Sequence, residues 1–450
     1  MPTATEPSGQ RSRDVKSRRI LLGFCAIVAA FLIYQASVIW LATARMDSGQ
    51  RGPMERGAAL VPGNGEAWDR LGRLMQFDFE NPHLDLAIAD YQKAVHDDPL
   101  SSYYWMDLAA AYEDAGDSTH AREAFERAKS VYPASALVAW SYGNFLLRQQ
   151  EYPAGFEVIR QAVEIDPGLL PITISRTWRA TQDAQQLLQV LPEDAEAYLQ
   201  ALDFLSSNSE PDAALAVWRR LMDIYQPGAA SKPATASKPL PLPRTFAFFD
   251  ALIRAGRADD ARVSWEQALA AAGLPASDAA GTSLVFDGDF AADFSDGGLG
   301  WRWDRPIGAA MSFDSPPPGV AGRSLRLDFD GGNNLALDSP SQYVPVAPNR
   351  ACRFHALIRT EEITTESGIS FSIEDPTHPA DVGLLTEALN GSHPWGPMDI
   401  AFTTGADTHF LLIRVLRNPS RLFENKLAGI VWIADVSVVC GAAPPEKATP

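Results

Sequence analysis

The distribution of hydrophobic and polar residues divides the chain into three stretches. An uncharged apolar run extends from Ile20 to Ala44. Between residues 65 and 275, apolar and small residues recur at the spacing of packed helices. From Ser283 to Cys440, short alternating runs are separated by clusters of Gly, Pro, Asn and Asp, which is typical of strands. The pattern predicts a multidomain chain: a single transmembrane helix, an all-α region and an all-β sandwich.

The apolar run is long enough for a helix to cross a bilayer core about 30 Å thick. Basic residues dominate the segment before it, so the positive-inside rule keeps residues 1–19 in the cytoplasm and sends the chain after Arg45 into the periplasm. We therefore predict a basic tail (1–19) and a single-pass anchor (20–44) in the cytoplasmic membrane. A second interpretation stays open, because Ala42-Thr43-Ala44 is typical of a signal-peptide cleavage site.

Proline recurs with a period of 34 residues in the helical stretch, at Pro99, Pro133 and Pro167. Small and large apolar residues precede each proline at fixed distances. Small residues let two antiparallel helices approach closely, and proline ends the second helix. A fixed period of this length predicts a stack of helical hairpins. Around the second proline, the periodic residues are Ala121, Phe125 and Ala128.

The segment Trp105–Pro133 resembles the tetratricopeptide repeat at every marker position except Ala109, where that family usually has glycine. The resemblance implies repeats over 65–225 and a last helical hairpin (244–275). Five prolines and a doubled Ala-Ser-Lys-Pro between them predict an extended, solvated linker (226–243). The resemblance also implies a concave face, formed by the first helix of each pair, that binds protein partners. In the register of the family, the groove residues are Asp69, Arg73, Tyr103, Met106, Trp140 and Asn144.

The alternative for Met106 and Trp140 is that they pack against neighbouring repeats. Other large aromatic residues of the repeats stand at positions that the family reserves for packing, so we expect them in the core. These are Trp68, Trp105, Phe125, Trp218 and Trp265.

The last stretch contains seven alternating runs, from Leu284–Phe286 to Ile430–Val439, which predict the strands of an antiparallel sandwich. The opening run through Asp289-Phe290, then Gly300-Trp301, and the closing Val431–Val436 follow one another in a characteristic order. This succession resembles the galactose-binding-like jelly roll of carbohydrate-binding modules. The resemblance covers 283–440 and implies a jelly-roll sandwich that binds glycan. We expect a disordered tail over 441–450.

Tryptophan is the side chain best suited to stacking on a sugar ring. Trp395 lies in a run rich in Gly and Pro, which predicts an exposed loop and makes it the first candidate for glycan contact. Trp301 and Trp303 share one face of an extended segment and are two further candidates. For this pair the alternative is burial in the sandwich core.

The resemblance also implies a structural calcium ion between the opening and the last strand. Asp287, Asp289 and Asp435 offer the oxygen ligands that calcium prefers. The family often has a glutamate shortly after the opening strand, where this chain has Ala291. The departure from the family pattern weakens the expectation of an ion.

The composition of the chain excludes some classes of binding partner. A net charge of −18 argues against nucleic acid and anionic lipid headgroups as partners of the exported part. Of three cysteines, Cys25 lies in the anchor, and an oxidising compartment allows Cys352 and Cys440 to form a disulfide. Motifs of hydrolases, metalloproteases and phosphate-binding loops are missing from the sequence, so we expect no enzymatic activity and, calcium aside, no cofactor.

These observations predict a membrane-anchored periplasmic scaffold that recruits protein partners through its repeats. A role in cell-envelope or exopolysaccharide assembly fits the combination with a sandwich that contacts polysaccharide. Two alternatives stay open: a purely structural interaction protein whose sandwich binds no sugar, and an auxiliary or degenerate subunit of a glycan-processing enzyme.

Overall fold

The computed structural model describes residues 8–61, 63–78, 82–225, 238–274 and 283–441. The chain divides into two units, Met1–Leu169 and Leu170–Pro450, each described by itself below. The predictions for residues 1–7, for 226–237 of the expected linker and for the tail from 442 lie outside the described residues.

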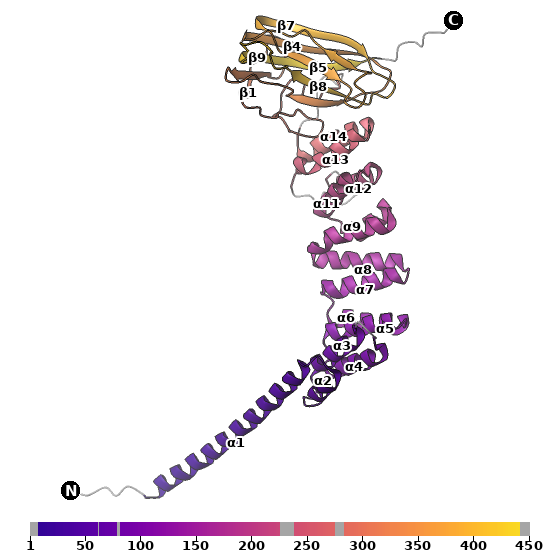
Figure 1. The fold of residues 1–450 in the computed structure, drawn as a ribbon, viewed down its shortest axis with the longest axis vertical. Helices are drawn as coiled ribbons and strands as arrows, with labels where there is room; N and C mark the ends of the chain where they lie inside the picture. The colour runs from indigo at the N-terminus through magenta and orange to yellow at the C-terminus, as the bar shows by residue number, and fades with distance from the viewer. Residues whose placement is uncertain (1–7, 62, 79–81, 226–237, 275–282, 442–450) are drawn as a thin grey trace, which may run out of the picture. The chain divides into compact units, whose positions relative to one another are not determined.

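The first unit consists of one long helix and a series of short antiparallel hairpins (Figure 1). The long helix α1 includes the expected anchor, and α2 is a short helix that the sequence pattern did not predict. Three hairpins follow, each made of two helices of similar length. The elements are α1 (Ser8–Met46), α2 (Arg51–Ala58), α3 (Gly65–Gln76), α4 (Leu84–Asp97), α5 (Ser102–Asp114), α6 (Ser118–Val131), α7 (Ala136–Arg148), α8 (Tyr152–Ile165) and the 3-10 turn η1 (Pro167–Leu169).

Close contacts within each hairpin explain the periodic small residues. A Cβ atom on Gly72 of α3 would lie 2.6 Å from the ring of Tyr91 on α4, and one on Gly143 of α7 would lie 2.8 Å from Ile159 on α8. On the second helix of the middle hairpin, Ala128 is fully buried. Larger side chains at these positions would push the helices apart, because protein interiors are close-packed.

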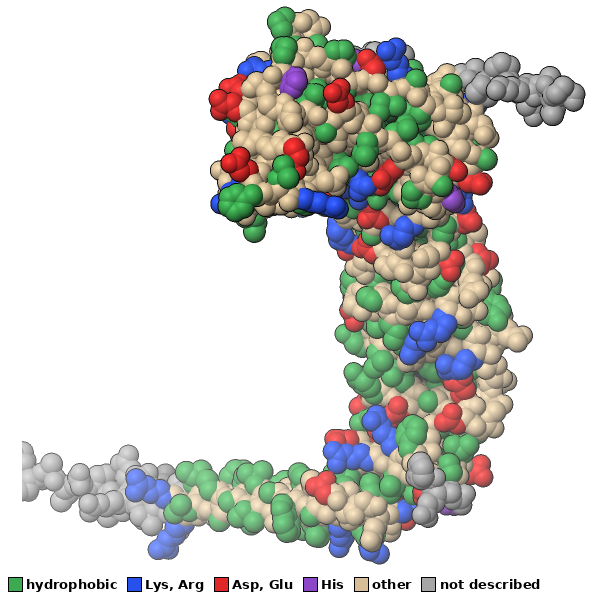
Figure 2. Space-filling model, turned by 45° about the horizontal axis from the view of Figure 1, so that its top comes forward, with side chains coloured by type: hydrophobic (Ala, Val, Ile, Leu, Met, Phe, Trp, Pro, Cys, Tyr) green, Lys and Arg blue, Asp and Glu red, His purple; other side chains and the backbone are tan. Residues whose placement is uncertain are grey.

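The end of α1 is part of the folded unit rather than a free extension. Ala42 and Met46 are buried, and Met46 belongs to a hydrophobic cluster with residues of α2 and α3, among them Met54 and Leu71. Gly57 of α2 lies so close to α1 that a Cβ atom there would be 2.8 Å from the carbonyl oxygen of Ala42. The preceding turns of α1 carry exposed apolar side chains (Figure 2).

The second unit begins with six helices. Leu240 and Leu242, within the expected linker, are buried, and the Leu240 N–H donates to the carbonyl of Ala271. The prediction of an extended, solvated linker is therefore wrong for residues 238–243, because two leucines there pack on the last hairpin. The helices are α9 (Leu170–Thr181), α10 (Ala184–Val190), α11 (Ala195–Ser207), α12 (Pro211–Tyr225), α13 (Phe246–Arg254) and α14 (Ala258–Ala272), with the 3-10 turn η2 (Leu242–Thr245).

Two antiparallel sheets form a sandwich after α14. One has the strand order β1-β2-β9-β4-β7 and the other β3-β8-β5-β6. Inward side chains of both sheets form one hydrophobic core, with Phe354 and Phe371 in contact across it. The strands are β1 (Ala309–Asp314), β2 (Ser324–Asp330), β3 (Ser341–Pro345), β4 (Ala351–Ile363), β5 (Ser370–Glu374), β6 (Gly383–Leu385), β7 (Gly391–Thr403), β8 (Phe410–Leu416) and β9 (Ala428–Cys440).

One expected strand is replaced by turns. In the segment Leu284–Phe286, the Leu284 N–H donates to the carbonyl oxygen of Val438 on β9, at 2.8 Å. The Phe286 N–H donates instead to the side-chain oxygen of Gln342, which is fully buried. The Gln342 side chain replaces the backbone partner that a neighbouring strand would supply. The segment therefore lies beside β9 but does not form a regular strand.

The last helical hairpin and the sandwich share a tightly packed seam within the second unit. Trp265 of α14 contacts Phe249 of α13 and Phe286 of the sandwich in T-shaped, edge-to-face arrangements. A Cβ atom on Gly298 would lie 2.2 Å from the Trp265 ring, so only glycine fits there. An ion pair of 2.9 Å between Arg302 and Asp250 adds a polar link.

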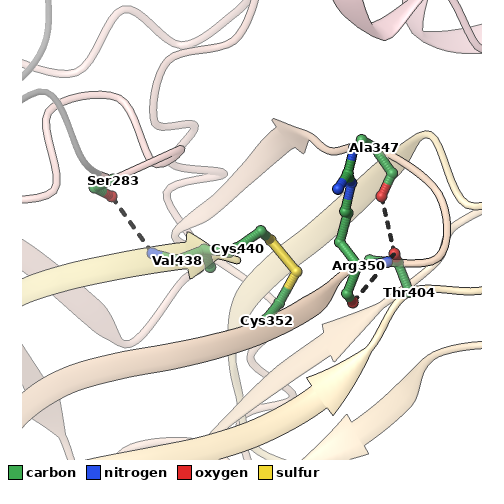
Figure 3. Close-up of a disulfide and its surroundings, with 7 residues drawn as sticks. All are labelled: Ser283, Ala347, Arg350, Cys352, Thr404, Val438 and Cys440. Carbon is green, nitrogen blue, oxygen red and sulfur yellow. Dashed lines mark hydrogen bonds between the residues drawn. A yellow bond between two sulfur atoms is a disulfide. The ribbon is translucent and has the colours of Figure 1, made fainter. Parts of the chain in front are cut away.

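A disulfide joins Cys352 on β4 to Cys440 on β9, which stand opposite each other in the register of the two strands (Figure 3). The neighbouring backbone is held by side-chain hydroxyls. The Val438 N–H donates to Ser283 Oγ, and Thr404 Oγ1 accepts from the Arg350 N–H at 2.8 Å. The bridge thus ties the end of β9 to the start of β4, its neighbour in the same sheet.

Candidate functional site

The first helices α3, α5 and α7 carry the predicted groove residues of the first unit. Corresponding positions on these helices change in character along the array. Glu66 on α3 is followed by Tyr103 on α5 and Leu137 on α7, and Asp69 by Met106 and Trp140 in the same way. The face is therefore acidic at α3 and apolar at α5 and α7. Two rows of side chains define this face: Glu66, Tyr103 and Leu137, and Asp69, Met106 and Trp140. We call it the first-helix groove, after the concave face that the resemblance implies for these helices.

Two carboxylates share one guanidinium at the acidic end. Arg73 Nε lies 3.1 Å from Asp69 Oδ2 and 2.9 Å from Asp107 Oδ2, and the Arg73 side chain is half exposed. Asp69 is only 5% exposed, and its Oδ1 has no hydrogen-bond partner among the described residues. Sequence reasoning found Asp69 and Arg73 but missed Asp107, which belongs to the next repeat.

Burial raises the pKa of Asp69 to about 7, and the nearby negative charge of Asp107 acts in the same direction. Arg73 lowers it only in part, because its charge is divided between the two acids. The acidic end therefore has a carboxyl group that changes its charge near neutral pH.

A second ion pair links α5 to α7. Arg148 donates from Nε and Nη2 to the two carboxylate oxygens of Glu113, at 2.6 and 2.7 Å. Like Arg73, Arg148 thus connects one first helix to the next. Both arginines are already paired with carboxylates of the array, so the groove keeps an excess of negative charge at α3 and α5.

The apolar end combines exposed and packed side chains. Tyr103 is 57% exposed, and Leu137 is 45% exposed. Met106 and Trp140 are half-buried and pack against the hydrophobic core of the repeats. Asn144 donates from its side chain to the carbonyl of Trp140, one turn earlier, at 2.7 Å. Tyr103 and Leu137 therefore offer the larger apolar surface to a partner.

Trp395 lies in the sandwich on the edge strand β7, not in the loop that the Gly and Pro residues predicted. It is half-buried and lines a cleft of about 500 Å³. The cleft also includes Glu387, His393 and Asp399, and a hydrogen bond from His355 lowers the pKa of Asp399, which stays ionised. An indole beside carboxylates and an imidazole can stack on a sugar ring and bind its hydroxyls.

Trp301 and Trp303 have no such exposure. They are 2% and 5% exposed, and the Trp301 indole N–H donates to the carbonyl oxygen of Asp287. Both rings belong to the sandwich core, so neither presents a face to a sugar. The expectation that Trp301 and Trp303 contact glycan is therefore wrong, because both side chains are buried.

The three aspartates of the expected calcium site serve other contacts. Asp287 Oδ1 accepts the Ala292 N–H at 3.0 Å, and Asp435 Oδ2 lies 3.6 Å from His355 on the neighbouring strand β4. The Asp289 carbonyl accepts the N–H of Arg323. No group of three His, Cys, Asp or Glu side chains suited to a metal occurs in the described ranges.

The family model of the tetratricopeptide repeat matches residues 79–136 and 107–169. These residues contain tetratricopeptide repeats. The match covers α4 to α8, with the first helices α5 and α7 of the groove. Repeats of this kind are typically interaction modules for other proteins. No curated protein matches the sequence.

Several solved structures resemble the helical part. YrrB, described as a TPR protein with an unusual peptide-binding site, is 14% identical over 48% of this chain and 91% of its own, with a TM-score of 0.24. MamA is 17% identical over 47% of this chain and 93% of its own, with a TM-score of 0.23. PilF of Pseudomonas aeruginosa is 16% identical over 43% and 92%, with a TM-score of 0.28. TM-scores this low do not establish a common arrangement of repeats.

Proposed function

We propose that this chain is a membrane-anchored scaffold that recruits protein partners through the first-helix groove, in cell-envelope or exopolysaccharide assembly. The observation that carries the proposal is the exposed surface of Tyr103 and Leu137 on repeats of an interaction family. Aromatic side chains on a rigid surface contribute strongly to protein binding. Two alternatives are kept: a purely structural interaction protein whose sandwich binds no sugar, which the polysaccharide experiment below tests, and an auxiliary or degenerate subunit of a glycan-processing enzyme, which turnover assays on glycan would reveal.

Anchoring is supported by α1. Residues Arg18–Met46 are long and apolar enough to cross a membrane, a test that a signal sequence near the N-terminus also passes. Cleavage after Ala44 would remove Ala42 from its buried contact with α2 and would leave Met46 at a new chain end. Loss of buried apolar contacts destabilises a fold, which favours the uncleaved anchor. The intact mass of the protein isolated from membranes distinguishes an uncleaved chain from one that begins at Arg45.

Orientation follows from the basic residues before the apolar run, which favour a cytoplasmic N-terminus and an extracytoplasmic repeat array. A reporter enzyme that is active only in the periplasm, fused after Pro450, should be active. Activity of a reporter restricted to the cytoplasm at the same position would contradict this orientation.

Site-specific crosslinking tests the groove. A photo-reactive amino acid replaces Tyr103, and Tyr132 is the control, because it is the same residue with nearly the same exposure, 54% against 57%, at the end of α6. We expect Tyr103 to give a discrete crosslinked protein in the native envelope and Tyr132 to give none. Crosslinks that do not differ between the two positions would contradict recruitment through the groove.

A second function, glycan binding by the sandwich, is favoured by Trp395 and the carboxylates of its cleft. We expect Trp395→Ala to weaken polysaccharide binding by about 1–3 kcal/mol, the contribution of one stacked aromatic. Phe423→Ala is the control, because Phe423 is a fully exposed aromatic residue outside the cleft. Retention of the full chain on polysaccharide gels measures the effect. If the wild-type chain binds no gel, the sandwich is a protein-docking or structural module.

A further inference from the structure

The first-helix groove has a direction, because its acidic and apolar residues are separated along the array. Accessible carboxylates lie at α3 and α5, where Glu66 is 59% exposed and Asp107 is 24% exposed. Asp69 lies behind them with an unpaired, buried oxygen. Exposed apolar side chains follow at Tyr103 and Leu137.

The acidic end contains more negative than positive charge. Glu66, Asp69 and Asp107 stand against Arg70 and Arg73, and the Arg73 guanidinium is shared by Asp69 and Asp107. Glu66 pairs with Arg70, one turn further along α3. A further cation placed over Asp107 and Glu66 would allow Arg73 to pair with Asp69 alone. It would also reduce the repulsion among the three acids. A carboxylate from a partner would meet the same acids and be repelled.

We propose that the groove binds a partner segment in which a basic side chain stands next to apolar side chains, the basic one at Glu66 and Asp107 and the apolar ones on Tyr103 and Leu137. The proposal rests on the proposed function and adds the chemistry of the partner. Its support is charge complementarity at one end and matched exposed apolar surface at the other. A segment with an acidic residue in place of the basic one would meet Glu66 and Asp107, and a segment without apolar side chains would leave Tyr103 and Leu137 uncovered.

The proposal makes binding depend on pH. The groups that face Asp69 are Glu66 and Arg73 on its own helix, Tyr91 on α4, and Tyr104 and Asp107 on α5. Both tyrosines have a raised pKa because they are buried, so they stay neutral. Asp69 itself ionises at about pH 7, and a bound cation favours its ionised form. By linkage, affinity for a cationic segment rises as the pH increases through this range.

Peptide binding to the full chain in detergent micelles tests the inference. The probes are a fluorescent peptide with two lysines followed by leucines (the lysine-first peptide), the same peptide with glutamates in place of the lysines, and the same peptide with serines in place of the leucines. We expect the lysine-first peptide to bind at least about tenfold more tightly than either control. Asp69→Asn should reduce its affinity about tenfold and abolish the increase with pH. Asp85→Asn, an exposed aspartate at the start of α4, should change neither.

The outcomes separate this inference from the proposed function. Equal binding of the lysine and glutamate peptides, no binding of any peptide, or unchanged affinity and pH dependence in Asp69→Asn would overturn the preference for a basic side chain next to apolar ones. Crosslinking of a partner through Tyr103 would still support recruitment by the groove in each of these cases. Absence of that crosslink, together with tight binding of the lysine-first peptide, would instead contradict recruitment in the envelope while the chemical preference stands.

Discussion

The repeats of the first unit and the sandwich of the second are stabilised by contacts of different range. Repeat contacts join neighbouring helices, such as Gly72 with Tyr91, and recur with the period of the sequence. Sandwich contacts join distant segments once each: the Trp432 indole donates to Asp314 on β1, and Arg417, buried, donates to the carbonyl of Leu335. The repeats thus use the same helix–helix contact several times, whereas each long-range contact of the sandwich occurs once.

The comparison predicts unequal tolerance to mutation. In the repeats, a change affects one interface between helices, and neighbouring repeats keep their own contacts. In the sandwich, a core residue contacts both sheets, so its loss affects the whole domain. The following predictions test this difference, in order of decreasing effect.

The largest effect is expected for Trp301→Ala. Its ring is buried against Phe290 and Phe294, and its removal leaves a large cavity in the core. Such a truncation typically lowers the free energy of unfolding by about 3–5 kcal/mol. Chemical denaturation of the full chain, followed by near-UV circular dichroism, measures it. Trp395→Ala, on the cleft, is the control, and an equal loss in both variants would contradict the core assignment.

Loss of the disulfide should have the next largest effect. Cys352 and Cys440 are 88 residues apart in the sequence, so the bridge restricts the unfolded chain strongly. We expect Cys352→Ser with Cys440→Ser to lower the free energy of unfolding by about 2–4 kcal/mol. Cys25→Ser should leave it unchanged, because Cys25 is an exposed free cysteine of α1. A double variant as stable as the wild type would show that the strands are sufficient without the bridge.

A smaller loss is expected in the repeats for Ala128→Trp. Ala128 is fully buried on α6, and a larger side chain overpacks the hairpin at a cost of about 1–3 kcal/mol. Ala134→Trp, in the exposed turn before α7, is the control. Thermal unfolding monitored by circular dichroism distinguishes them. Equal melting temperatures would show that the helices do not meet at Ala128.

The last prediction concerns a slope rather than a single loss of stability: the pH dependence that Asp69 causes is at most about 1.4 kcal/mol per pH unit, as for any one group. The pKa of Asp69 rises from 3.8 to about 7 on folding, so the folded state binds the extra proton between these values. Its contribution to stability is complete below 3.8 and is lost as the pH rises to about 7. Asp69→Asn should flatten this part of the stability profile, measured by denaturation across the range, and Asp85→Asn should not.

The sequence predicted the contacts that recur in every repeat and missed an ion pair that occurs between two particular repeats. The repeat period placed the hairpins and brought Asp69, Arg73 and Tyr103 to first helices, because each position depends only on local packing. Asp107 was missed, since its role arises from contact with the preceding repeat. A search for opposite charges one repeat apart along the first helices would have found the pair of Arg73 and Asp107.

In the sandwich, alternation predicted most strands but not the environment of the tryptophans. Alternation places Trp301 and Trp303 on one side of a segment, and only the tertiary fold decides whether that side faces the core. Trp395 follows prolines and glycines that are typical of loops, yet edge strand β7 accommodates them, because an edge strand leaves part of its backbone unpaired. Leu284–Phe286 failed as a strand because Gln342 takes over its pairing.

The seam where Trp265 lies against Gly298 and Gly300, and Phe246 against Gly297, has a consequence for self-association. A helical array ends in a helix whose outer face matches the next repeat, and such open ends join head to tail into filaments. In the second unit, the sandwich occupies the outer face of α14 with Phe286 and Gly298, so that end of the array has no vacant position for another copy. The sandwich therefore terminates the helical array in the way that a dedicated capping repeat does in other solenoid proteins.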